Sequence, residues 1–409
     1  MAEVSNPSSG LPVRASVTDA SLLEGLLFSG GPPQALARWL GLIRAGEPHL
    51  MRRALLTVAI GWLPLVVLTA LRGDLIRPDT ANSFLLDFGI HLRFLVAAPL
   101  LVLAQAVCVP RLADLARQFV DMGLIADADR VRYDAAVTSS QRLMNLPVVE
   151  VALTVLAYAL VFALVKATPP EVVPSWHGRL NPFAASPAGW WALLISLPLL
   201  LLLLLGWLWR ICVWSRFLWL MSRLQLQLDG THPDHAGGVG FVSESLEAFL
   251  PLGFIVGVIC AGPVVNQVLH HHANPLQFKS VAIGAFIVVA LLCAVPLLVF
   301  VGRLLKERSR ARRQYGAFAV RMDKRFHAKW LSAASGTVRT DQGPLDVSDL
   351  TGTNIANLLA ANARAMRILP LESKSVGLLI VATLLPFVPV WLLVVPFDQV
   401  AKKLSSFLL

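Results

Sequence analysis

The stretch Trp190–Trp209, WWALLISLPLLLLLLLGWLW, decides the fold class of this chain. It contains no charged residue, and as a helix it is long enough to cross the ~30 Å hydrocarbon core of a bilayer. Six more apolar stretches of similar length are Ala54–Leu71, Gly89–Val109, Val148–Ala167, Ala248–Leu269, Val281–Val301 and Val376–Val395. The sequence therefore predicts an all-α fold, a polytopic transmembrane helix bundle of about seven spans.

The composition of the chain agrees with this class of protein. Of its 409 residues, 56% are hydrophobic and 15% are charged, whereas soluble domains carry about 25% charged residues. Its four cysteines form no CxxC pair, so neither a disulfide framework nor a zinc finger is predicted. The chain also lacks a P-loop, a GxSxG motif and an HExxH motif, the common sequence signatures of nucleotide-binding proteins, serine hydrolases and zinc metalloproteases.

Lysine and arginine collect on one side of the predicted spans. The segments 1–53, 110–147, 210–247 and 302–375 hold 27 of the 35 basic residues, and the segments on the other side hold 6. The positive-inside rule places the first set in the cytoplasm. We therefore expect a multi-pass plasma-membrane protein with a cytoplasmic N-terminus and a periplasmic C-terminus.

The same pattern predicts how the chain is divided. The expected parts are a cytoplasmic N-terminal segment 1–53, six spans within 54–301 with cytoplasmic helical loops 110–147 and 210–247, a cytoplasmic basic helical segment 302–375, and a last span with a short tail 376–409.

Two of the spans are expected to continue as helices beyond the membrane. The fourth meets no helix breaker between Gly206 and Arg223, so Arg210 should snorkel or face phosphate, and Trp207 and Trp214 should lie in the aromatic belt. The sixth continues through Arg303–Trp330, where one helix face carries Tyr315, Phe318, Met322, Phe326 and Trp330.

The extension of the sixth span is strongly basic. The stretch Arg303–Lys329 has a net charge of +8. A basic amphipathic helix beside a bilayer is typical of binding to anionic lipid headgroups, and Arg308, Arg310, Arg312 and Arg313 are the candidates for lipid or partner binding. Because no recognisable nucleic-acid module is present, nucleic acid is not an expected partner, whereas a homo-oligomer or another membrane protein stays open.

The loop after the fourth span concentrates groups that can bind metal or move protons. Asp229, His232, Asp234 and His235 lie close together, and Gly237 and Gly238 give the backbone freedom to turn around them. His232, Asp234 and His235 are candidate ligands of a divalent metal, although no third distant ligand is identifiable. The alternative is a structural turn with no cofactor, in which an aspartate caps a helix.

This loop also carries a resemblance. The segment His232-Pro-Asp-His-Ala-Gly-Gly-Val-Gly-Phe241 resembles the HPDxxGGxGF loop of a family of uncharacterised bacterial polytopic inner-membrane proteins. Asp87, His91-Leu-Arg-Phe94 and Pro99-Leu are similar to residues of that family as well, but Gln105 stands where a glutamate is expected. The resemblance implies a bacterial inner-membrane protein and no particular activity.

A second group of candidate residues lies inside the membrane. Asp87 and His91 are four residues apart near one end of the second span, and Arg93 is two residues deeper. Ionisable side chains in spans face a cavity or each other, so these three predict a polar pocket. Asp87 and His91 could form a pH-sensitive pair there.

Three functions remain open from the sequence. The first is a transporter or channel for an ion or small solute, based on the pocket of Asp87, His91 and Arg93. The second is a membrane scaffold or sensor that binds anionic lipid or a partner through the basic helix. The third is a membrane-embedded metal-dependent enzyme that uses the 229–241 loop.

Overall fold

The computed structural model describes residues 30–32, 50–77, 83–168, 174–179, 184–271, 273–328 and 347–392. Most of the expected N-terminal segment, Trp330 and the C-terminal tail lie outside these ranges. The described chain contains seven helices long and apolar enough to cross a membrane. The prediction of an all-α polytopic bundle is thus confirmed; the described strands are the two-residue pair β1 (Gly178–Arg179) and β2 (Ala184–Ala185).

Most of the spans are built from several helical pieces. In chain order they are α3 (Leu50–Gly61) with α4 (Leu63–Arg72); α5 (Phe88–His91), η3 (Leu92–Ala97), α6 (Ala98–Leu103) and α7 (Gln105–Asp121); α9 (Pro147–Ala167), which follows α8 (Arg130–Met144); α10 (Pro187–Trp191), η7 (Ala192–Ser196) and α11 (Leu197–Arg223); α12 (Glu244–Ala248) and α13 (Leu250–His271); α14 (Lys279–Ala294), η10 (Val295–Phe300) and α15 (Val301–Phe326); and, after α16 (Val347–Ala365), α17 (Ser373–Leu384) with α18 (Val388–Leu392).

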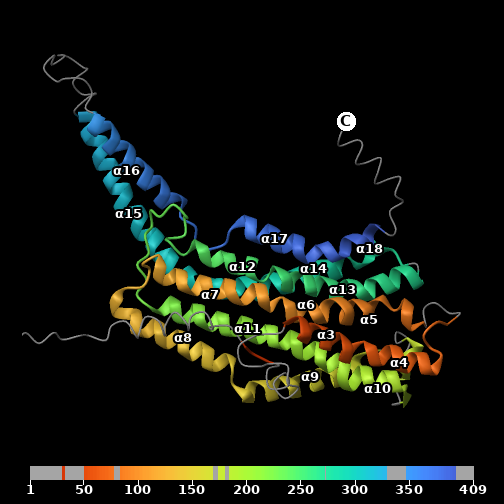
Figure 1. Ribbon diagram of the computed structural model, residues 1–409. Helices are drawn as coiled ribbons and strands as arrows, with labels where there is room; N and C mark the ends of the chain where they lie inside the picture. The colour runs from red at the N-terminus through yellow and green to blue at the C-terminus, as the bar shows by residue number, and fades with distance from the viewer. Residues whose placement is uncertain are drawn as a thin grey trace, which may run out of the picture.

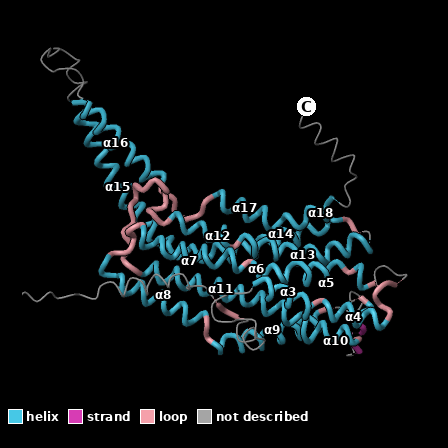
Figure 2. The backbone as a smooth tube through the Cα atoms, viewed as in Figure 1, coloured by secondary structure: helices cyan, strands magenta, loops and turns pink. Residues whose placement is uncertain are grey.

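The bundle has two distinct ends. At one end α15 continues out of the bundle and packs against α16, and the two helices project as a hairpin (Figures 1 and 2). We call this the hairpin end. The opposite end is formed by α4, α5, α10 and α18 (Figure 1). The expected helical continuations of the fourth and sixth spans are therefore confirmed, the fourth to Arg223 and the sixth to Phe326.

The contact between α15 and α16 is made by small residues. Its most buried residues are small, namely Ala311 and Ala319 on α15 and Ala356, Ala360 and Ala363 on α16. Alanine lets two helices approach closely, because it adds little volume between them. Phe318, which the sequence placed on the aromatic face of this helix, is exposed.

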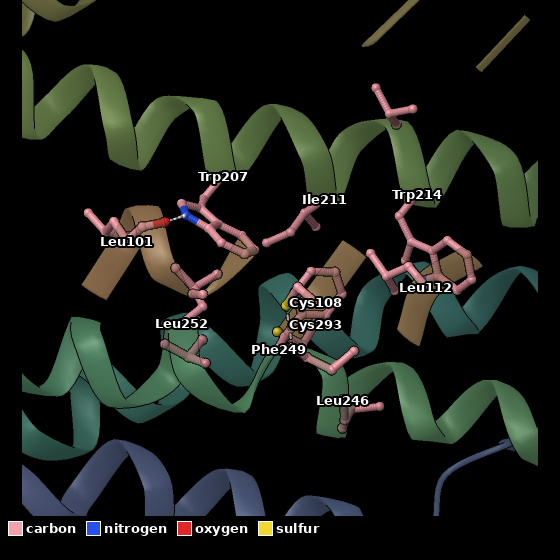
Figure 3. Close-up of a cluster of buried hydrophobic side chains, with 14 of the residues drawn as sticks. Leu101, Cys108, Leu112, Trp207, Ile211, Trp214, Leu246, Phe249, Leu252 and Cys293 are labelled. Atoms are coloured by element: carbon pink, nitrogen blue, oxygen red, sulfur yellow. Dashed lines mark hydrogen bonds between the residues drawn. The ribbon is translucent and has the colours of Figure 1, made fainter. Parts of the chain in front are cut away.

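Two expectations for α11 were wrong. Trp207 and Trp214 are each 1% exposed and point into the core against the second and fifth spans (Figure 3). The Trp207 Nε1–H donates to the Leu101 carbonyl at 2.9 Å, so this indole is satisfied inside the protein and not at a lipid interface. Arg210 does not snorkel, because its guanidinium donates to the Gly30 carbonyl at 2.7 Å and lies over the Trp207 ring.

Candidate functional site

The first candidate site surrounds Asp87, at the end of the bundle opposite the hairpin. Asp87 is the N-cap of α5, and its Oδ1 accepts the Ile90 backbone N–H at 3.2 Å. Aspartate is favoured at this position, because its carboxylate satisfies an amide that has no partner in the first helical turn. The local sequence alone therefore accounts for this one hydrogen bond.

Two further donors reach Asp87 from distant parts of the chain. The Asn266 Nδ2–H donates to Oδ1 at 2.8 Å, and the Trp176 Nε1–H donates to Oδ2 at 3.2 Å. Asn266 Oδ1 in turn accepts the Phe88 backbone N–H at 2.9 Å. The carboxylate is thus a buried junction of the second span, the loop before the fourth, and α13.

Glycines at the junction allow α13 to pack closely against α5. A Cβ added to Gly262 would lie 3.0 Å from the Gly89 Cα, and one added to Gly89 would lie 3.2 Å from the Asn266 Nδ2. Both positions need glycine for α5 and α13 to approach so closely. In the same way, Gly189 leaves room for the backbone of His177.

His91 is close to Asp87 in sequence, but the structure gives it other partners. Its Nδ1 accepts the Trp62 Nε1–H at 2.9 Å, and its Nε2 lies 3.1 Å from the Leu85 carbonyl. An acceptor at Nδ1 and a donor at Nε2 correspond to the neutral imidazole. The structure therefore does not bring the His91 and Asp87 side chains together as a hydrogen-bonded pair, although the His91 backbone N–H donates to the Asp87 carbonyl at 3.4 Å.

Arg93 differs from both of these residues. It lies in η3, a π-helical segment inside the second span, and interacts electrostatically with Asp87, His177 and Cys260. Within the described part of the chain, its guanidinium makes no hydrogen bond and has no carboxylate oxygen within 4.0 Å. An arginine is always charged, so its five N–H donors inside a span have no hydrogen-bond partner among the described residues.

His177 closes the group and was not predicted from the sequence. Its ring stacks on Trp176 with centroids 3.6 Å apart, and its Nδ1 is buried without a hydrogen-bond partner among the described residues. Burial lowers the pKa of His177 to about 4; Asp87 opposes this shift and Arg93 adds to it. We call Asp87, Arg93, Trp176, His177 and Asn266 the Asp87 cluster.

The second candidate site is the loop between α11 and α12. The Asp234 carboxylate accepts backbone N–H groups from Ala236 at 2.8 Å, Gly238 at 3.0 Å and Gly240 at 2.9 Å. Gly237 and Gly238 have φ values of 69° and 91°, which turn these amides toward the carboxylate. Burial alone would raise the pKa of Asp234, but the three amides and His232 together lower it.

The other candidate ligands in the loop do not converge on one point. Asp229 Oδ1 accepts the Thr231 backbone N–H and hydroxyl, and His235 has a buried Nδ1 that makes no hydrogen bond in the described chain. Among the four, the His232 and Asp234 side chains form an ion-pair contact, with Nδ1 and Oδ1 2.8 Å apart. In the described ranges no three His, Cys, Asp or Glu side chains are grouped as metal ligands.

The loop also holds several elements together at the hairpin end. The Arg367 N–H donates to the His235 carbonyl at 2.6 Å, and the Asn362 side chain donates to the Thr231 carbonyl at 3.3 Å. A Cβ on Gly230 would lie 2.2 Å from that of Ala311 on α15. The geometry is that of a structural turn that docks the hairpin, although neither aspartate caps a helix.

The four candidate arginines of the basic helix lie at different places on α15. The Arg308 Nε is buried and makes no hydrogen bond within the described part, whereas Arg312 donates to the Arg364 carbonyl at 2.9 Å. Arg313 is exposed, and Arg310 lines a groove beside Gln227. The four arginines therefore differ in exposure and in the parts of the chain that they contact.

The sequence pointed to Asp87 and Arg93 but missed Trp176, His177 and Asn266. Asn266 offered one signal, since it is a polar side chain inside an apolar helix. Trp176 and His177 offered none, because they belong to a loop whose position depends on tertiary contacts. Comparisons with family models, with curated proteins and with solved structures found no match to this chain.

Proposed function

We propose that this polytopic membrane protein transports a small anion, which pairs with Arg93. The observation that supports the proposal is the guanidinium inside the second span with no hydrogen-bond or ion-pair partner in the described chain. A charged side chain in a span carries a large desolvation cost, so such residues mark ion or substrate pathways. An anion at this position would offset that cost.

The surroundings of Arg93 fit this role. Asp87 acts on the guanidinium electrostatically, but its carboxylate oxygens accept from Ile90, Trp176 and Asn266 and form no direct ion pair with Arg93 in the described chain. His177 stays neutral near physiological pH because its pKa is lowered to about 4. An incoming carboxylate or phosphate can accept two parallel N–H bonds from an arginine, which gives both affinity and orientation.

The backbone around Arg93 is π-helical, which is compatible with a conformational change of the second span. π-Helical segments are rare and occur frequently at functional sites. One lies at Arg93 and a second, η7, lies in the fourth span, which contacts the first span beside it. Both segments are in the half of the bundle opposite the hairpin, where a helix could change register during transport.

The proposal is tested with proteoliposomes on a solid-supported membrane. Concentration jumps of acetate, inorganic phosphate and chloride are applied, and charge movement is recorded for the wild type, Arg93→Ala and Arg142→Ala. Arg142 is an exposed arginine of α8 and serves as the matched control. We expect charge movement with at least one anion, lost in Arg93→Ala and kept in Arg142→Ala.

Two results would overturn the proposal. One is charge movement no larger than in protein-free liposomes for every anion. The other is a wild-type response in Arg93→Ala, which would show that the guanidinium takes no part.

A further inference from the structure

A basic groove lies at the hairpin end, outside the Asp87 cluster. It has a volume of about 410 Å³ and runs between the segment Leu226–Leu228 and the beginning of α15. Arg303, Lys306 and Arg310 line it together with one acidic residue, Glu307. None of the three cations forms a hydrogen bond or ion pair within the described ranges. The groove thus has an excess of positive charge that the described residues do not neutralise.

This groove lies at the level of a membrane surface. Arg303 follows the apolar helices α14 and η10 after only Val301 and Gly302. The hydrocarbon core must end near this point, because the next turns of α15 carry several charged residues. Lipid phosphates are found at this depth, so the cations face the headgroup layer.

A second, apolar groove of about 200 Å³ lies deeper in the membrane. It runs between α11, α13 and α14, and its lining residues include Leu208, Ile211, Val256, Val288 and Leu292. The lining is almost entirely hydrocarbon, and Leu208 and Val288 are exposed on the outside of the bundle. Its chemistry fits an acyl chain.

The two grooves are bordered by the same two chain segments. One is α11 with its continuation to Leu228, and the other is α14 with η10 and α15. From Leu292 to Arg303 the helix rises about 15–20 Å, while half of the hydrocarbon core measures about 15 Å. Val295 and Leu298, which lie between the grooves, are exposed on the same helix.

From this arrangement we propose that the two grooves bind one anionic phospholipid. Its phosphate lies among Arg303, Lys306 and Arg310, and one acyl chain lies along α11 and α14. The lipid belongs to the leaflet at the hairpin end and fixes the base of the hairpin to the bundle. This site does not depend on the proposed transport of an anion through Arg93.

The test uses the delipidated full-length chain in detergent, with native mass spectrometry as the readout. Phosphatidylglycerol and phosphatidylcholine are added separately to the wild type, to Arg303→Gln/Lys306→Gln, and to Arg312→Gln/Arg313→Gln. The last variant removes the same charge from α15 outside the groove. We expect selective binding of phosphatidylglycerol, weakened about thirtyfold in the groove variant and little changed in the control.

Three further arms test the details of the site. Glu307→Gln should strengthen phosphatidylglycerol binding, because it removes the one negative charge in the groove. Val288→Trp should weaken binding without a change in charge, since the indole fills the apolar groove. Millimolar inorganic phosphate should compete poorly, because it lacks the acyl chain.

The proposal would be overturned by equal phosphatidylglycerol binding in the groove variant and the control. It would also be overturned if inorganic phosphate displaced the lipid completely while Val288→Trp had no effect. That result would indicate a site for free phosphate and not for a lipid.

Discussion

Asp87 and Asp234 are both carboxylates surrounded by N–H donors, but the donors have different origins. Asp234 accepts from Ala236, Gly238 and Gly240, all within its own loop. Asp87 accepts from Ile90 nearby and from Trp176 and Asn266, which lie 89 and 179 residues away in sequence. The first carboxylate shapes a turn, and the second joins three separate parts of the bundle.

This difference determines what each site can do. The hydrogen bonds of a local network do not depend directly on the relative position of distant helices, so the Asp234 loop is suited to docking the hairpin. A network that crosses helices is sensitive to their relative position. The Asp87 cluster therefore couples the second span, which carries Arg93, to α13 and to the loop before the fourth span.

The largest effect should come from breaking the long-range network. Asp87→Ala leaves Trp176, Asn266 and the Ile90 amide without an acceptor, and we expect a loss of about 3–5 kcal/mol in the free energy of unfolding. The measurement is unfolding by SDS titration, followed by circular dichroism. Asp121→Ala, at an exposed position on α7, is the control and should stay near the wild type. A small loss in Asp87→Ala would mean that the junction is not needed for the fold.

The next effect is a dependence of stability on pH that originates at His177. Its pKa is about 4 in the folded protein and 6.5 when unperturbed. Between these values the unfolded chain binds a proton that the folded chain does not, so stability falls as the pH is lowered from 6.5 to 4. The loss attributable to this group is up to about 3 kcal/mol. The free energy of unfolding is measured for the wild type and His177→Asn between pH 4 and 6.5. The difference between the two should change with pH by this amount, and a difference independent of pH would contradict the prediction.

The smallest effect should come from Asp234. Asp234→Ala removes the acceptor of three amides in a partly exposed loop, and we expect a local loss of about 2 kcal/mol. Hydrogen exchange at the Gly238 and Gly240 amides should speed up, while amides of α13 keep their protection. Asp234→Asn retains one carbonyl acceptor, so its stability and exchange rates should lie between those of the wild type and Asp234→Ala. If exchange in α13 accelerated equally, the loop would not be a local unit.

The contrast between the two aspartates also explains what the sequence could predict. Apolar length predicted all seven spans, and the absence of breakers predicted the continuation to Arg223, because both depend on local composition. The glycines at 237 and 238 predicted a tight turn for the same reason.

Features that depend on tertiary packing could not be predicted in this way. Trp207 and Trp214 were expected in a lipid-facing belt, but the direction in which α11 faces its neighbours places them in the core. His91 lies four residues from Asp87, yet Trp62 and Leu85 of other segments take both of its ring nitrogens. The resemblance of the 232–241 loop to a bacterial membrane family and the location of the termini stay predictions.

The most direct test of the central claim, that Arg93 is present for an anion and not for the fold, is the thermal stability of Arg93→Gln. The midpoint of thermal unfolding is compared with those of the wild type and Arg142→Gln, in detergent without added carboxylate or phosphate. The account predicts that Arg93→Gln is at least as stable as the wild type, because an unpartnered charge has been removed from a span. A midpoint clearly below those of the wild type and Arg142→Gln would contradict it, since Arg93 would then stabilise the bundle itself.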